Sequence, residues 1–199
     1  MTTNPAAVSP LQGIAFLLEE EEFPFTLLRA DEKRLVDILL VDVGVEGEPV
    51  PAELLFLGDL FAAAGEEDPN SHPVLQILAR LNLELSDETL SGVSRLCGTL
   101  TEALGYGAIS CSEETRVVFL RIFLHLSDRT VDGHVLGSVL SQAKMILAMG
   151  VPALREVGSG RWPYEKAVQS LIAKGFELPV MESLPVVDSS KRFQPEYLS

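Results

Sequence analysis

The clearest hydrophobic pattern of the chain lies at residues 116–126, where apolar positions alternate with mixed ones. One row is entirely apolar and consists of Val118, Leu120, Ile122, Leu124 and Leu126. The other row mixes aromatic rings with cations and consists of Val117, Phe119, Arg121, Phe123 and His125. Because successive side chains of a strand point to opposite faces, the pattern predicts a strand whose first row packs on helices. The second row is expected on a partly solvated sheet face or a contact surface, which makes its five residues the candidates for binding a partner.

Apolar residues at helical spacing predict helices at residues 10–21, 86–104, 132–149 and 163–174. Ser9-Pro10 is typical of a helix start, and Ser86 is a suitable N-cap with acidic residues in the following turn. Gly150 and the Val151-Pro152 pair predict the end of the third helix. The glycines at 158 and 160 predict a flexible joint before the fourth.

The remaining elements are less sharply defined. Residues 23–45 predict a hairpin with strands at 25–28 and 35–43. Residues 51–64 are compatible with a helix or, at 54–57, with a third strand, whereas 73–81 are expected to be helical and 83–85 to form a short strand. Residues 65–72 read as an acidic loop. Together these elements predict an α+β fold, in which a small antiparallel sheet packs with helices in an α-β-β-β-α-β-α-like order.

Two segments are predicted along the chain. Residues 1–157 form an α+β domain, and residues 158–199 form a C-terminal helical extension that ends in an extended tail with three prolines. The start of the chain lacks the basic region of a signal peptide, and no apolar run approaches the roughly 18–20 residues of a membrane span. The expected location is cytoplasmic.

Charge is distributed unevenly. Residues 1–100 hold 18 Asp and Glu against 5 Lys and Arg, so this half contributes −13 to a net charge of −14. The chain is nevertheless 47% hydrophobic, with a mean hydropathy of +0.24, which indicates a packed domain with one strongly acidic region. Such a field argues against direct binding to nucleic acid or to anionic membranes and favours a basic protein partner, although solubility is an equally physical reason for it.

Residue patterns of catalytic and metal sites are missing from the sequence. The histidines stand alone at 72, 125 and 134, and Cys97 and Cys111 do not form a C-x-x-C pair. A shared site of His125 and His134 is an alternative to two isolated histidines. Cys97 lies on the apolar side of its helix, which predicts a buried free thiol rather than a disulfide. Asp37 and Asp42 read as structural or surface acids. Neither a nucleophile elbow nor a phosphate-binding loop is present, so no cofactor is predicted.

The last part of the predicted domain resembles a known family. A strand at 116–126, the turn Ser127-Asp128-Arg129-Thr130, a long helix from 131 to 149 and then Pro152-Ala153-Leu154 are similar to the end of YbjN-like bacterial proteins. Members of that family are similar in fold to class I type III secretion chaperones, which are small acidic dimers that bind an extended partner segment on apolar patches. The resemblance covers residues 10–157 by topology and 115–155 by pattern. The chain departs from it at 51–85 and beyond 158.

Three hypotheses of function follow. The first is a non-enzymatic, dimeric adaptor or chaperone-like protein that binds another protein, such as a basic nucleic-acid-binding one. Its dimer would pair the strand at 117–126 or the strand at 35–43, placed at an edge or on an open face. The second is a small-molecule enzyme with a cleft of scattered carboxylates and His125 or His134. The third is a single-stranded nucleic-acid binder that uses Phe119, Arg121 and Phe123.

Overall fold

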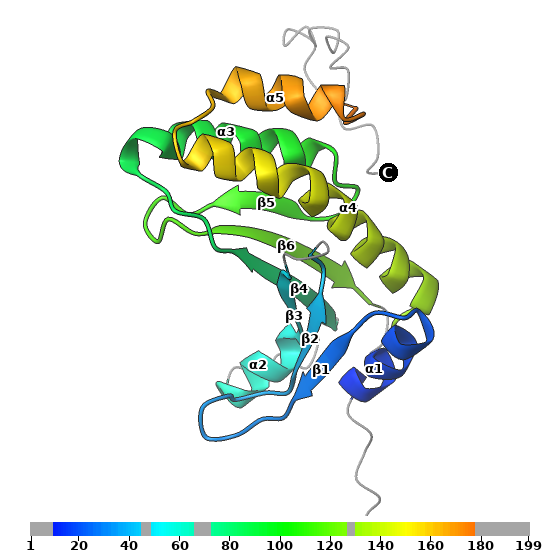
Figure 1. Ribbon diagram of the computed structural model, residues 1–199. Coiled ribbons are helices and arrows are strands. Elements are labelled where there is room, and N and C mark those ends of the chain that lie inside the picture. Colours follow the sequence, from blue (N-terminus) through cyan, green and yellow to red (C-terminus); the bar gives the residue numbers. More distant parts are fainter. Residues whose placement is uncertain (1–9, 45–48, 66–72, 127–129, 178–199) are drawn as a thin grey trace, which may run out of the picture.

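The computed structural model describes residues 10–44, 49–65, 73–126 and 130–177 (Figure 1). In this part of the chain six strands form one antiparallel sheet, in the order β1-β2-β3-β4-β6-β5. The strands are β1 (Phe25–Leu28), β2 (Ile38–Asp42), β3 (Pro51–Phe56), β4 (Val74–Leu81), β5 (Ala108–Cys111) and β6 (Val118–His125). The helices are α1 (Pro10–Glu20), α2 (Leu57–Ala63), α3 (Asp87–Glu102), α4 (Gly133–Gly158) and α5 (Tyr164–Ala173). The predicted α+β class, with an antiparallel sheet packed against helices, is confirmed.

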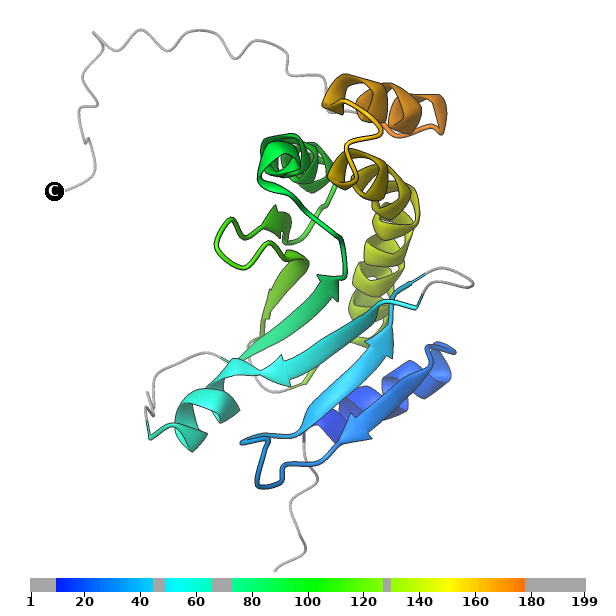
Figure 2. The ribbon, with the colours of Figure 1, turned by 60° about the vertical axis from the view of Figure 1, so that its left-hand side comes forward.

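One face of the sheet is covered by α1, α3 and α4. Alternate residues of each central strand are buried on this face, and in β6 they are the predicted row from Val118 to Leu124. Helix α1 contributes Leu11, Ile14 and Leu18 to the same core, and α3 and α4 contribute the apolar stripes that their helical spacing predicts. The exception is Val135, which was expected on the inner side of α4 and is 47% exposed. Figure 2 shows these helices on one side of the sheet, whereas the short helix α2 lies at the far end of the strands.

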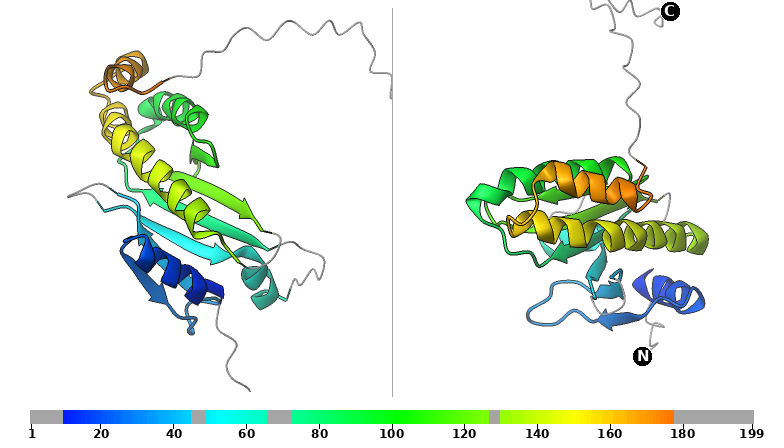
Figure 3. Two further views of the ribbon diagram at one scale, coloured as in Figure 1. Left: turned by 90° about the vertical axis from the view of Figure 1, so that its right-hand side faces the viewer. Right: turned by 45° about the horizontal axis from the view of Figure 1, so that its top comes forward.

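Helix α5 forms an outer layer on α3 and α4 (Figure 3, right). Its Ala167 and Leu171 are buried in the main core, as is Phe176 just beyond it. The hydroxyl groups of Thr99 in α3 and Tyr164 in α5 lie 2.9 Å apart, and the guanidinium of Arg95 stacks over the Tyr164 ring at 3.9 Å. The C-terminal helix is therefore attached to the domain by packing and by polar contacts, while a division of the chain at residue 158 stays a prediction.

Two of the expected elements that concern the sheet are wrong. Residues 73–81 were expected to be helical but form β4, the central strand between β3 and β6, and no strand lies at 83–85. For residues 51–64 a strand and a helix were both compatible with the sequence, and the structure contains both, because β3 is followed directly by α2. The strands expected to mediate dimerisation at an edge, β2 and β6, lie in the interior of the sheet, whose edges are β1 and β5. Of the two, β6 still presents one open face.

Helix α4 is longer than its sequence pattern predicts. Gly150 does not end it, because the glycine is buried against Leu100, to which an added Cβ would approach within 2.7 Å. Pro152 lies inside the helix, where its missing N–H leaves the Ala148 carbonyl without its helical donor. The helix ends instead at Gly158, and the expected joint is a turn in which Gly160 adopts a φ of +73°.

By length and hydropathy α4 would pass for a membrane span, and among the described helices it is the only one to do so. Half of its most apolar window is buried inside the protein, however, against α3, the sheet and α5. The core helices of folded domains pass the same test, so the hydropathy of α4 is explained here by its place between two layers.

Candidate binding surface

The second face of the sheet, here called the open face, is formed by the residues that alternate with the buried ones along the strands. In β6 its residues are Phe119, Arg121, Phe123 and His125, of which Phe119 is half-buried and the other three are exposed. The sequence predicted this split between the two faces of the strand, and the structure confirms it. Of the helices that the structure describes, α3 and α4 lie on the other face of β4 and β6, and α2 meets β4 only near the end of the strand (Figure 1).

The fifth candidate residue, Val117, lies just outside the strand. Its carbonyl accepts a hydrogen bond from the Ser112 backbone N–H at 2.9 Å, which closes the β5–β6 hairpin. Its side chain is half-buried. The structure therefore brings four of the five predicted residues together along β6 and places Val117 at the turn beside them.

Strand β4 supplies the other half of this surface, which the sequence analysis missed. Antiparallel pairing sets Val74 opposite His125, Gln76 opposite Phe123, Leu78 opposite Arg121 and Arg80 opposite Phe119. We call these eight residues the β4–β6 stripe. The signal in the sequence is the alternation of apolar residues at 75, 77, 79 and 81, which are buried and follow the two-residue period of a strand. It was missed because other positions of the segment are also apolar, so that a helical period fitted as well.

Charge on the β4–β6 stripe is positive. The guanidinium of Arg121 stacks on the Phe119 ring at 4.8 Å and forms no ion pair with any described side chain. Arg80, whose side chain is 64% exposed, approaches Glu53 of β3 only to 4.0 Å, the outer limit of an ion pair. Two cationic groups therefore lie on this surface with little compensation from neighbouring acids.

A hollow of about 350 Å³ lies at the end of β3 and β4, next to Arg80. Its walls include Pro51, Glu53, Asn82, Val151 and Arg155, so they come from the sheet and from the last third of α4. Because Glu53 and Arg80 belong both to the hollow and to the open face, the two form one continuous surface.

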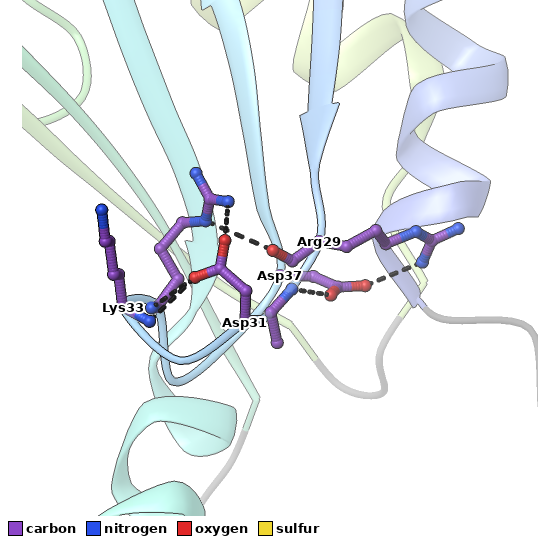
Figure 4. A network of polar contacts seen from close by, with 6 residues as sticks. Arg29, Asp31, Lys33 and Asp37 are labelled. Atoms are coloured by element: carbon purple, nitrogen blue, oxygen red, sulfur yellow. Dashed lines mark hydrogen bonds and ion pairs between the residues drawn. The ribbon is translucent and has the colours of Figure 1, made fainter.

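The carboxylates of the first hairpin serve local structure (Figure 4). Asp31 accepts hydrogen bonds from the backbone N–H groups of Lys33 and Arg34, both at 2.9 Å, and pairs with the Arg34 guanidinium. The Lys33 backbone hydrogen bond, together with the Arg34 contacts, holds the pKa of the Asp31 carboxyl below its usual value. Asp37 accepts from the Arg29 guanidinium and the Ala30 N–H, each at 2.8 Å.

Asp42 has a similar role at the next connection. Its carboxylate accepts from the backbone N–H groups of Gly44 and Val50, at 2.8 and 2.9 Å, and so holds both ends of the β2–β3 loop. Asp37 and Asp42 were expected to be structural or surface acids, and these contacts explain both positions structurally.

The acidic residues occupy several separate parts of the described chain rather than one region. Glu19 to Glu22 lie exposed at the end of α1, Asp31 and Glu32 at the hairpin tip, and Asp87 and Glu88 at the start of α3. Helices α1 and α3 are at opposite ends of the molecule in Figure 1. The expected acidic loop at 65–72 lies mostly outside the described residues.

The two thiols are free, as predicted, and Cys97 is buried. Burial raises the pKa of Cys97 to about 12 and also raises the pKa of Cys111 in β5. Both therefore carry their protons at neutral pH, which is unlike the lowered pKa of reactive cysteines.

The histidines were expected to be isolated or to share a site. His134 lies 3.8 Å from Glu21 at the α1–α4 contact, His125 lies on the open face, and His72 is outside the described residues. Within the described ranges no three His, Cys, Asp or Glu side chains gather in a way that could hold a metal ion.

The chain was compared with models of known protein families, with curated proteins and with solved structures, and nothing matched in any of the three. The resemblance to YbjN-like proteins and to secretion chaperones therefore stays a prediction. What the structure defines is an α+β protein whose sheet has one helix-covered face and one open face.

Proposed function

We propose that this protein is a non-enzymatic, chaperone-like adaptor that binds an extended segment of another protein on its open face. The observation that carries the proposal is the exposed row of β6, in which Phe123 is 43% exposed in the middle of a sheet face. Large apolar side chains that remain exposed on a continuous surface are typical of interaction sites. Three carboxylates, Asp31, Asp37 and Asp42, are engaged in loop hydrogen bonds, and burial raises the pKa of both thiols, which agrees with a non-enzymatic role.

Two features of charge bear on the partner. The net charge of −14 favours a basic protein through long-range attraction, as the sequence predicts. The open face itself carries the cations Arg80 and Arg121, which favour the opposite sign at short range. A cytoplasmic location and a homodimer complete the proposal; light scattering at micromolar concentration tests the dimer, and a monomer there contradicts it.

The test of partner binding compares two phenylalanines. Phe123 on β6 and Phe16 on α1 are both exposed, the second to 61%, but only Phe123 lies on the open face. Tagged full-length protein and its Phe123→Ser and Phe16→Ser variants are each used to recover partners from the native lysate by cross-linking. We expect Phe123→Ser alone to lose the specific partner. Equal recovery by all three proteins contradicts the proposal.

A further inference from the structure

We propose that the segment bound on the open face is acidic: an extended chain in which carboxylates alternate with apolar side chains. This inference rests on the proposed function and specifies its partner. It concerns the β4–β6 stripe, because the register fixes which side chains meet there.

The stripe has a regular arrangement of polar and apolar groups. Each of its four cross-strand pairs joins one apolar side chain to one polar or cationic side chain: Val74 with His125, Phe123 with Gln76, Leu78 with Arg121, and Phe119 with Arg80. Along β6 the order is Phe119, Arg121, Phe123, His125, so aromatic and cationic groups alternate. A ligand that lies along the stripe therefore meets apolar and cationic groups in turn.

The spacing of these groups matches an extended polypeptide. Residues on one face of a strand repeat every two positions, roughly 6.6 Å apart, and a bound extended chain has the same repeat. Arg80 and Arg121 are diagonal neighbours across the β4–β6 pair, at a separation of roughly 7–8 Å in such sheets. Two carboxylates at alternate positions of an extended segment lie on the same side and can thus each face a guanidinium, whereas the apolar side chains between them point to the other side.

The guanidinium groups are available for such contacts. Arg121 is exposed and has an aromatic ring on one side but no carboxylate partner among the described residues. Arg80 has only the long contact with Glu53. Arginine binds carboxylates through paired N–H donors, and such charge-assisted hydrogen bonds are stronger than neutral ones.

Single-stranded nucleic acid also offers negative charge, but the stripe suits it less well. Stacking of successive bases requires several free aromatic faces, whereas the Phe119 ring carries the Arg121 guanidinium at 4.8 Å, which leaves Phe123 as the one open ring on β6. The aliphatic residues Val74 and Leu78 offer no stacking platform. A polyanion is also repelled more strongly than a short peptide by a chain with a net charge of −14.

The test uses full-length protein and labelled peptides of alternating composition: valine with glutamate, valine with serine, and valine with lysine. Single-stranded oligothymidylate is the fourth probe, and fluorescence anisotropy reports binding. We expect the glutamate peptide to bind about tenfold more tightly than the serine peptide, and the lysine peptide to bind most weakly. Arg121→Gln is expected to weaken the glutamate peptide about threefold to tenfold and to leave the serine peptide unchanged.

Arg95→Gln is the matched control, since Arg95 also stacks on an aromatic ring, Tyr164, but lies away from the stripe between α3 and α5. Its affinity for the glutamate peptide should equal that of the unchanged protein, and thermal unfolding confirms that both variants are folded.

The inference is overturned if the glutamate peptide fails to bind, if the lysine peptide or oligothymidylate binds as tightly, or if both arginine variants behave alike. The proposed function is judged separately by the Phe123 and Phe16 pair. If only Phe123→Ser loses the partner and the peptides bind equally whatever their charge, the proposed adaptor function is supported and the acidic character of its partner is rejected.

Discussion

Strand β6 has two faces of different composition, and their contrast separates the residues that stabilise the fold from those of the proposed binding surface. Leu120 and Ile122, on the covered face, are fully buried beneath α3 and α4. Arg121 and Phe123, one residue further along, are exposed on the open face. The same backbone therefore carries a row that holds the fold together and a row that is free to contact a partner. Substitutions one position apart are expected to have opposite kinds of effect.

The largest expected effect comes from the covered face. Leu120→Ala removes a side chain that is 0% exposed and leaves a cavity between the sheet and its helices. Such substitutions cost about 2–5 kcal/mol of unfolding free energy. Urea denaturation followed by circular dichroism measures the loss. A change below about 1 kcal/mol would show that the two faces of β6 are not as different as their burial indicates.

The next effect tests how the open face is held at the edge of the sheet. Gly107, just before β5, has a φ of +84°, and an added Cβ would lie 2.3 Å from the Arg121 carbonyl oxygen. Gly107→Ala is therefore expected to cost about 2–4 kcal/mol, through backbone strain and the clash together.

Gly175→Ala provides the control for this substitution. Gly175 has a similar φ of +87° but nothing within 4 Å of an added Cβ. Gly175→Ala should therefore lower the unfolding free energy only through backbone strain, by about 1 kcal/mol. Equal losses in the two variants, measured by thermal unfolding, would mean that the contact with the Arg121 backbone does not matter.

The pH dependence of stability compares a thiol buried in the core, Cys97, with a less buried thiol in the edge strand β5, Cys111. The pKa of Cys97 is raised by burial from its ordinary value of 9.0 to about 12. The unfolded chain therefore releases this proton at lower pH than the folded one. The stability that the protonated thiol provides is fully present below pH 9 and is lost as the pH rises toward 12.

At pH 10.5 the loss should amount to about 2 kcal/mol relative to pH 8, and Cys97→Ala should reduce this part of the alkaline slope. Denaturation curves between the two pH values measure it. The same slope in Cys97→Ala as in the unchanged protein would rule out the thiol as its source. Cys111→Ala, at the less buried position in β5, serves as the comparison.

The smallest effect on stability is expected on the open face. Phe123→Ala removes a side chain that is already 43% exposed and should change the unfolding free energy by about 1 kcal/mol or less. Binding to a partner should nevertheless decrease. A loss of stability as large as that of Leu120→Ala would show that Phe123 is a core residue and not part of a contact surface.

The sequence predicted the elements with unambiguous periodicity. The two rows of β6, the helical stripes of α1 and α3 and the Ser86 cap of α3 all follow from local spacing, and all were confirmed. Helix α5 was predicted as well, but Ile172 of its expected apolar stripe is 51% exposed. Local patterns failed where both faces of a segment are apolar. In β4 the partly buried Val74 and Leu78 fill the gaps between buried residues, so helix and strand periods were both compatible with the sequence.

Tertiary packing explains the other differences. Gly150 and Pro152 are ordinary signals for a helix end, but buried contacts of Val151, Ala153 and Leu154 continue α4 past them. Half of the binding surface was missed for a related reason. The pairing of β4 with β6 joins residues 37 to 51 positions apart, and no spacing within a single segment reveals such a contact.

Pro152 has a further consequence for how the layers are connected. The released carbonyl of Ala148 gives α4 a point where it can bend without breaking another hydrogen bond. The earlier turns of α4 lie against Leu17 and Glu21 of the first helical segment, and the later turns, from Pro152 to Glu156, lie next to α5. One continuous helix therefore connects two parts of the protein, because α4 contacts α1 near its start and α5 near its end.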